Sequence, residues 1–205
     1  LGQLVGGGMG MPRFESAEVG NLELAWLIPL SLVGTVCGWL YFVSEHASEA
    51  LAHAMGERPI AKAMLAGLVL AACGTALPFT MFAGETQADV LMETYLTIPA
   101  GVLIATGLVK AMLTPALINM GWRGGHFFPV IFSGVSLGYG LAILTGADPV
   151  FCVAVCTAST MGAVMRQPVM VVGLLLMCFP LKGIVCMIIA AVIAAGIPLP
   201  KPLRK

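Results

Sequence analysis

The stretch GWRGGHFFPV, residues 121–130, sets three glycines, an arginine and a histidine directly before a long apolar run. Glycine adopts left-handed and extended conformations that other residues avoid, so this loop carries little side-chain bulk. Pro129 suits the first turn of a helix, where its missing N–H costs nothing. The pattern therefore predicts a helix that begins abruptly at about residues 127–129.

A helix that begins in this way can bind an anion. The first N–H groups of a helix have no partner within it and carry a partial positive charge. Inside a membrane they form an anion site without a full positive charge, and an anion held weakly can also leave, as conduction requires. The chemistry predicted for this stretch is reversible anion binding by main-chain groups. The alternative is a plain helix start with no ligand.

Three ionisable side chains accompany this stretch: Lys110, Arg123 and His126. Lys110 interrupts an apolar run, and an ionisable group in such a place indicates function, unless its ammonium snorkels to the interface. Arg123 either attracts anions to a vestibule or anchors the chain at the membrane surface. Protonation of His126 would favour anion entrance if its side chain reached the pathway; the alternative is a side chain turned to a loop carbonyl or water.

The composition predicts a membrane protein with no nucleic-acid partner. The chain has 205 residues, of which 59% are hydrophobic and 10% charged, and its mean hydropathy is +0.99. Soluble domains average about 25% charged residues. The net charge of zero offers no basic field to nucleic acid. The six cysteines lie in apolar runs without a C-x₂-C pair, and a metal or redox role for Cys152 and Cys156 is a minor alternative.

About seven apolar segments follow one another in the sequence, which predicts an all-α, multi-pass bundle forming a single membrane domain over residues 1–205. A helical span takes about 20 residues, and several of these segments are shorter and interrupted by glycine or proline, which indicates broken or tilted helices. Small residues recur at helix-contact spacing, as at Gly134 and Gly138. The expected segments are 24–43, 63–83, 95–120, 127–147, 149–165, 168–181 and 183–199.

Two polar stretches separate the early segments. Residues 44–62 are predicted to extend the first helix at the interface, with a metal site on His46 and His53 as the alternative. Residues 84–94 predict an aqueous loop or a short interfacial helix.

The two ends of the sequence also carry predictions. The basic tail KPLRK at 201–205 is expected on the cytoplasmic side of the cell membrane by the positive-inside rule. A start at Leu1 rather than methionine suggests a piece of a longer chain.

The residues Gly125, His126, Phe127, Phe128 and Pro129 fit the G-x-F-x-P motif of the ClC chloride channel and transporter family, which the sequence resembles. The context strengthens the resemblance. A helix with one lysine precedes the motif, VIFSGVSLGYGLA follows it, and CTASTMGAVMRQPVMVVGLLL resembles a later part of the family. The opening GMPRFE also resembles the extended link that precedes the mid-protein helix of the family. The resemblance covers most of the chain but only the C-terminal half of the family, and it is nearest to a divergent bacterial branch of ion-transport proteins.

This resemblance implies one half of an inverted-repeat transporter in which the N–H groups of His126 and Phe127 face a central chloride. It also implies a chloride channel or chloride/proton antiporter without a cofactor, and a homodimer whose subunits meet through residues 24–43 and 168–199. The sequence departs from the pattern of the family in three places. The first-half motifs with a pore serine and a gating glutamate are absent from these residues, as is a tyrosine near the end, and the family's acidic residue near 177–179 is replaced.

Other function classes have less support in the sequence. Neither the metalloprotease motif H-E-x-x-H nor a phosphate-binding loop occurs, so transport without covalent chemistry is expected. A membrane-embedded enzyme using Glu85, Asp89, Glu93 and the histidines is one alternative. A membrane assembly module without a pore, or a half-transporter fragment, is the other.

Overall fold

The computed structural model describes residues 13–81, 83–200 and 203, except the side chain of Glu85. Every regular element within these residues is helical, as predicted. The helices are α1 (Asn21–Ala54), α2 (Pro59–Ala76), α3 (Glu85–Thr94), α4 (Ala100–Asn119), α5 (Phe127–Thr145), α6 (Pro149–Met165), α7 (Pro168–Leu175) and α8 (Ile184–Gly196), with 3₁₀ turns η1 (Pro78–Thr80) and η2 (Tyr95–Thr97).

Four of these helices, α1, α2, α4 and α5, are long and apolar enough to cross a membrane, and α6 and α8 are shorter apolar helices. Several short segments were expected to form broken or tilted helices, and the segment 168–181 is broken: α7 ends at Leu175 and a turn follows. The polar residues 44–54 continue α1 as a helix. The acidic stretch after α2 forms the short helix α3. The tail used for the orientation lies outside the described residues, apart from Leu203.

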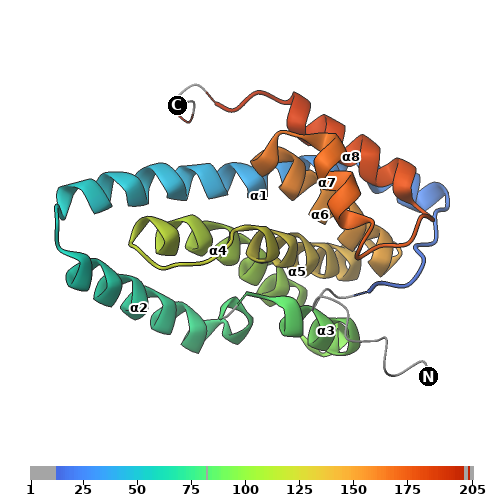
Figure 1. Cartoon of the computed structure of the whole chain (residues 1–205). Helices are drawn as coiled ribbons and strands as arrows, with labels where there is room; N and C mark the ends of the chain where they lie inside the picture. The colour runs from blue at the N-terminus through green and yellow to red at the C-terminus, as the bar shows by residue number, and fades with distance from the viewer. Residues whose placement is uncertain (1–12, 82, 201–202, 204–205) are drawn as a thin grey trace, which may run out of the picture.

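The centre of the bundle is formed by α5 and α6. Residues 130–140 of α5 and 151–163 of α6 are buried without a break. Helix α6 packs on α1, α5 and α8, while α4 packs on α1 and α5. In Figure 1, α1 and α2 run along opposite sides with α4 and α5 between them, and α7 and α8 lie over one end of α1. These two long buried stretches confirm that the apolar segments pack together as a helical bundle.

The start of α6 is held by two carboxylates. Asp148 is its N-cap, and its side chain accepts a hydrogen bond of 2.7 Å from the N–H of Phe151. The N–H of Asp148 donates to a carboxylate oxygen of Glu23 in the first turn of α1, at 3.2 Å. The beginnings of α1 and α6 are therefore tied together.

Asp148→Ala is expected to lower the free energy of unfolding by about 1 kcal/mol, because one N–H at the start of α6 loses its acceptor. Asp148→Asn keeps an acceptor oxygen and is expected to retain most of that stability. Thermal unfolding of the purified variants in detergent measures both. An alanine variant as stable as the asparagine variant would contradict the assignment of the cap.

Candidate functional site

The loop between α4 and α5 begins with a glycine that closes α4. Gly121 has φ +94, a left-handed conformation that favours glycine. Its N–H donates to the carbonyl of Ile118 at 2.9 Å, and the N–H of Trp122 donates to that of Leu117 at 3.1 Å. This pair of bonds is the Schellman arrangement, which satisfies the last carbonyls of a helix. The loop therefore leaves α4 in a defined direction, toward the start of α5.

Helix α5 begins at Phe127, inside the predicted range. His126 is its N-cap, no side chain caps it, and the first bond into the helix runs from the N–H of Val130 to the carbonyl of His126 at 3.1 Å. The N–H groups of Phe127 and Phe128 have no acceptor among residues 13–81, 83–200 and 203. Pro129 has no N–H to satisfy. The start of α5 thus presents N–H groups that donate to no described residue, together with its partial positive charge.

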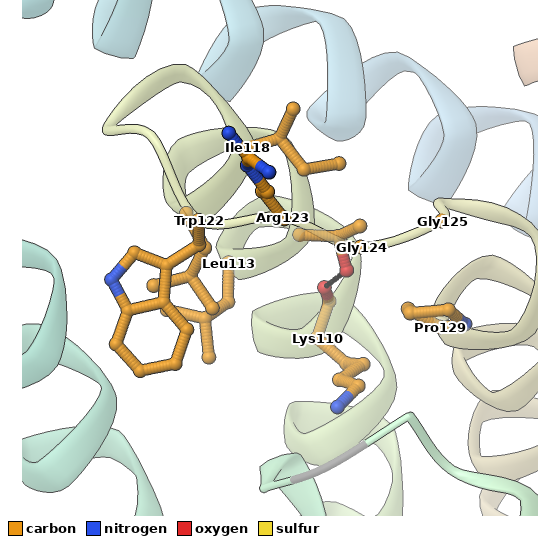
Figure 2. A pocket seen from close by; sticks show the side chains of 10 residues that line it. Lys110, Leu113, Ile118, Trp122, Arg123, Gly124, Gly125 and Pro129 are labelled. Atoms are coloured by element: carbon orange, nitrogen blue, oxygen red, sulfur yellow. Dashed lines mark hydrogen bonds between the residues drawn. The ribbon is translucent and has the colours of Figure 1, made fainter. Parts of the chain in front are cut away.

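A cavity of about 120 Å³ lies where α4, the loop and α5 meet (Figure 2). A site of roughly 10–15 Å³ holds one water molecule, so this cavity has room for a small anion with part of its hydration shell. Its walls combine apolar side chains of α4 with the backbone of two glycines. The lining residues are Lys110, Leu113, Thr114, Leu117, Ile118, Trp122, Arg123, Gly124, Gly125 and Pro129.

Gly124 and Gly125 keep their part of the wall open. A Cβ atom added at either position would have no heavy atom of the described residues within 4 Å. Neither residue is among those with positive φ. Glycine at these positions is therefore required neither by the backbone conformation nor by packing within the described chain. What it provides is empty space beside the start of α5.

Lys110, predicted as a pathway residue, lines the cavity but directs its ammonium elsewhere. The side chain is only 4% exposed. Its Nζ donates to the carbonyl oxygen of Thr80 at 2.6 Å and lies 3.5 Å from that of Met81. Figure 2 shows the side chain extending away from Gly124 and Gly125. The ammonium is held inside the protein by main-chain carbonyls, which is not the snorkelling arrangement.

The other two ionisable residues of the motif lie at the edge of the site. Arg123 is exposed and lines the cavity, and in Figure 2 its side chain turns toward Ile118 rather than Pro129. His126 is half-buried, and its ring stacks on that of Phe127 with 4.6 Å between the centroids. The imidazole therefore packs on its neighbour, an arrangement that neither sequence alternative anticipated.

The structure also locates three groups of residues whose types could indicate metal binding or catalysis. The described residues contain no group of three or more histidines, cysteines or acids that could hold a metal, and His46 bonds to the carbonyl of Phe42 in its own helix. The acidic residues of the enzyme alternative lie on α3, away from the cavity lining. The sequence GVSLG at 134–138 fits the G-x-S-x-G pattern of a nucleophilic serine. Its Ser136 is fully buried within α5 and donates to the carbonyl of Leu103 at 2.8 Å, so it is not an exposed nucleophile.

The carbonyls of Thr80 and Met81 are site components that sequence reasoning missed. They belong to the turn η1 and the residue after it, about 30 positions before Lys110 in the chain. A main-chain carbonyl belongs to every residue type, so composition gives no signal for it. Pro78, which starts η1, is the sole local hint that the chain turns there.

Comparisons with known proteins bear on the family and on the fold. The sequence model of the family described as voltage gated chloride channel matches residues 3–198. Among solved structures, the chain is similar to the crystal structure of a CLC-type fluoride/proton antiporter, with a TM-score of 0.77 and 20% sequence identity. That similarity covers 99% of this chain and 52% of the antiporter chain, so this chain spans about half of its length. The curated proteins contain no sequence match. At this identity the structural likeness concerns the fold.

Proposed function

The chain belongs to the voltage-gated chloride channel family, and from this premise we propose that it forms one wall of a pathway for a small anion across a membrane. Chloride is the first candidate. The carrying observation is the start of α5, where the N–H groups of Phe127 and Phe128 have no acceptor within the described part of the chain. The cavity beside them is bordered by two glycines and Pro129.

Physical chemistry supports transport at such a place over permanent binding. Main-chain N–H groups and a helix dipole attract an anion with a partial charge only. A full ion pair with a buried cation would hold the anion more strongly and slow its release, whereas conduction needs binding that is readily reversed. In this proposal Gly125, His126, Phe127, Phe128 and Pro129 form the binding segment, and Arg123 draws anions to the cavity from its exposed position.

The proposal extends to assembly and orientation. A chain that spans about half of the antiporter supplies one side of the pathway, and we propose that polypeptide outside residues 1–205 supplies the other. Exposed apolar side chains on α7 and α8, such as Val169 and Val185 at 87% and 63%, suit contact with lipid or with a second subunit. We propose a homodimer in the cell membrane with the C-terminal end of the chain in the cytoplasm.

Anion efflux from liposomes tests the proposal. The protein is purified at its full natural length, reconstituted with internal chloride or fluoride, and the external anion concentration and pH are recorded together. Chloride efflux is expected. Accompanying proton movement would identify an exchanger, as in the antiporter of similar fold, and its absence a channel.

Protein-free liposomes and liposomes with an unrelated membrane protein are the controls. A folded, reconstituted protein that moves neither anion would contradict the proposal. The alternative function, a membrane assembly module without a pore, would then be favoured.

A further inference from the structure

Lys110 lies where the connection between α2 and α3 crosses α4 and α5. Its Nζ donates to the carbonyl of Thr80 at 2.6 Å and lies 6.0 Å from the centre of the Phe132 ring, within cation–π range. Thr80 is fully buried, so its carbonyl needs a donor from within the protein. One side chain of α4 therefore contacts both the turn η1 and the first part of α5.

The same connection is fixed at two further points. A Cβ atom at Gly74 would lie 2.7 Å from Cγ of Met81, so the Met81 side chain packs directly on α2. Gly84 has φ +107, and a Cβ atom there would lie 2.5 Å from Cβ of Phe132. Residues 77–81, 83 and 84 are thus held between α2, α4 and α5, with Lys110 as a polar attachment.

This attachment adjoins the cavity at the start of α5. Lys110 lines that cavity, and so does Thr114 one turn further along α4, whose hydroxyl donates to the Lys110 carbonyl at 2.8 Å. Phe132, which packs on Gly84, lies five residues after the first residue of α5. A shift of the connection would therefore act on both helices that shape the cavity.

We propose that Lys110 is a positioning residue for the anion site: its ammonium fastens the turn at residues 77–81 to α4 and thereby fixes how α4 and the start of α5 face each other. The proposal rests on the proposed function, because the site it positions is the anion cavity. It assigns Lys110 no direct contact with the anion. Its effect on transport passes through the carbonyls of Thr80 and Met81.

The test compares Lys110→Met, which keeps the length of the side chain but removes its donors, with Lys110→Arg, which keeps charge and donors. Lys62→Met on α2 is the matched control, since Lys62 is partly exposed and lies outside the cavity lining. Amide hydrogen exchange of the full-length protein in detergent measures directly how often the attached segment opens. Anion flux in liposomes is measured over a range of chloride concentrations. It gives the half-saturating concentration and the maximal rate, which report the effect of the attachment on transport.

In Lys110→Met, amides of residues 77–81 are expected to exchange about tenfold faster or more, the equilibrium factor for losing a hydrogen bond to a charged group. Amides of α6 are expected to keep their rates. The half-saturating chloride concentration is expected to rise several-fold, with arginine restoring both readouts and Lys62→Met changing neither. If Lys110→Met does not yield folded protein, Lys110→Gln keeps one donor group without charge and is expected to give a smaller change of the same kind.

Unchanged exchange at residues 77–81 in Lys110→Met would overturn the proposal, whatever the transport result. Faster exchange with wild-type flux constants would overturn the link between the attachment and the cavity, and with it the proposal. Absence of flux from the wild-type protein would instead overturn the proposed function, while the exchange data would still decide whether Lys110 holds the connection.

Discussion

Valine in place of Gly125 is expected to remove most of the anion flux and to leave the fold intact. A Cβ atom at this position meets no heavy atom within 4 Å in the part of the chain that the structure describes, and the backbone is not in the left-handed region. The added methyl groups would therefore occupy open space beside the cavity that Gly125 lines. An anion held by the N–H groups at the start of α5 would have to pass or replace them. A barrier raised by about 1.4 kcal/mol already slows flux tenfold, and a loss of that size or larger is expected.

The measurement pairs chloride efflux per reconstituted protein with the thermal midpoint in detergent. Gly101→Val is the matched control, because a Cβ atom there also meets nothing within 4 Å and Gly101 lies at the other end of α4. That control is expected to keep both flux and stability. Phe127 is a less informative target, since its ring packs against the buried core. Full flux in a stable Gly125→Val protein would remove the start of α5 from the pathway.

Local rules of the backbone made the start of α5 predictable from sequence. Glycines before and a proline after the boundary restrict where a helix can begin, and α5 begins at Phe127. The same kind of signal located the end of α6, where Arg166 adopts φ 57 just before Pro168. The small residues of α5 were also interpreted correctly as helix contacts. Each of these predictions depends on a few adjacent residues.

Features that depend on distant partners were not predictable in this way. The continuation of α1 through residues 44–54 was predicted, but the contacts that secure it were not. Asn119 at the end of α4 donates to the carbonyl of Glu45 at 3.0 Å and to the hydroxyl of Ser48 at 2.8 Å. The partner of Lys110 is a carbonyl about 30 residues away. Such contacts form only when the helices assemble, so neither hydrophobic periodicity nor residue type predicts them. The role of the site residues themselves stays a prediction that flux must test.

Gly138→Ala is expected to destabilise the bundle more than any substitution on its outer faces. A Cβ atom at Gly138 would lie 2.4 Å from Cα of Val153 and 2.9 Å from the carbonyl oxygen of Cys152. Both are backbone atoms of α6, so no side-chain rotation relieves the overlap and the two helices must move apart. Overpacking of a tight core costs about 1–3 kcal/mol, occasionally more. The upper end is expected here, because α5 and α6 are the central pair and the separation would loosen contacts on both.

Gly134→Ala meets the same helix one turn earlier, with a Cβ atom 2.4 Å from Cα of Thr157. Once one alanine has separated the helices, the second has less to displace, so the double variant is expected to lose less stability than the sum of the two. Gly173→Ala on α7 is the matched control: it meets nothing within 4 Å, and alanine in a helix is worth up to about 1 kcal/mol over glycine. Thermal midpoints in detergent should therefore fall for the α5 variants and hold or rise for the control. Equal midpoints for all three single variants would mean that α5 and α6 do not approach this closely in the membrane protein.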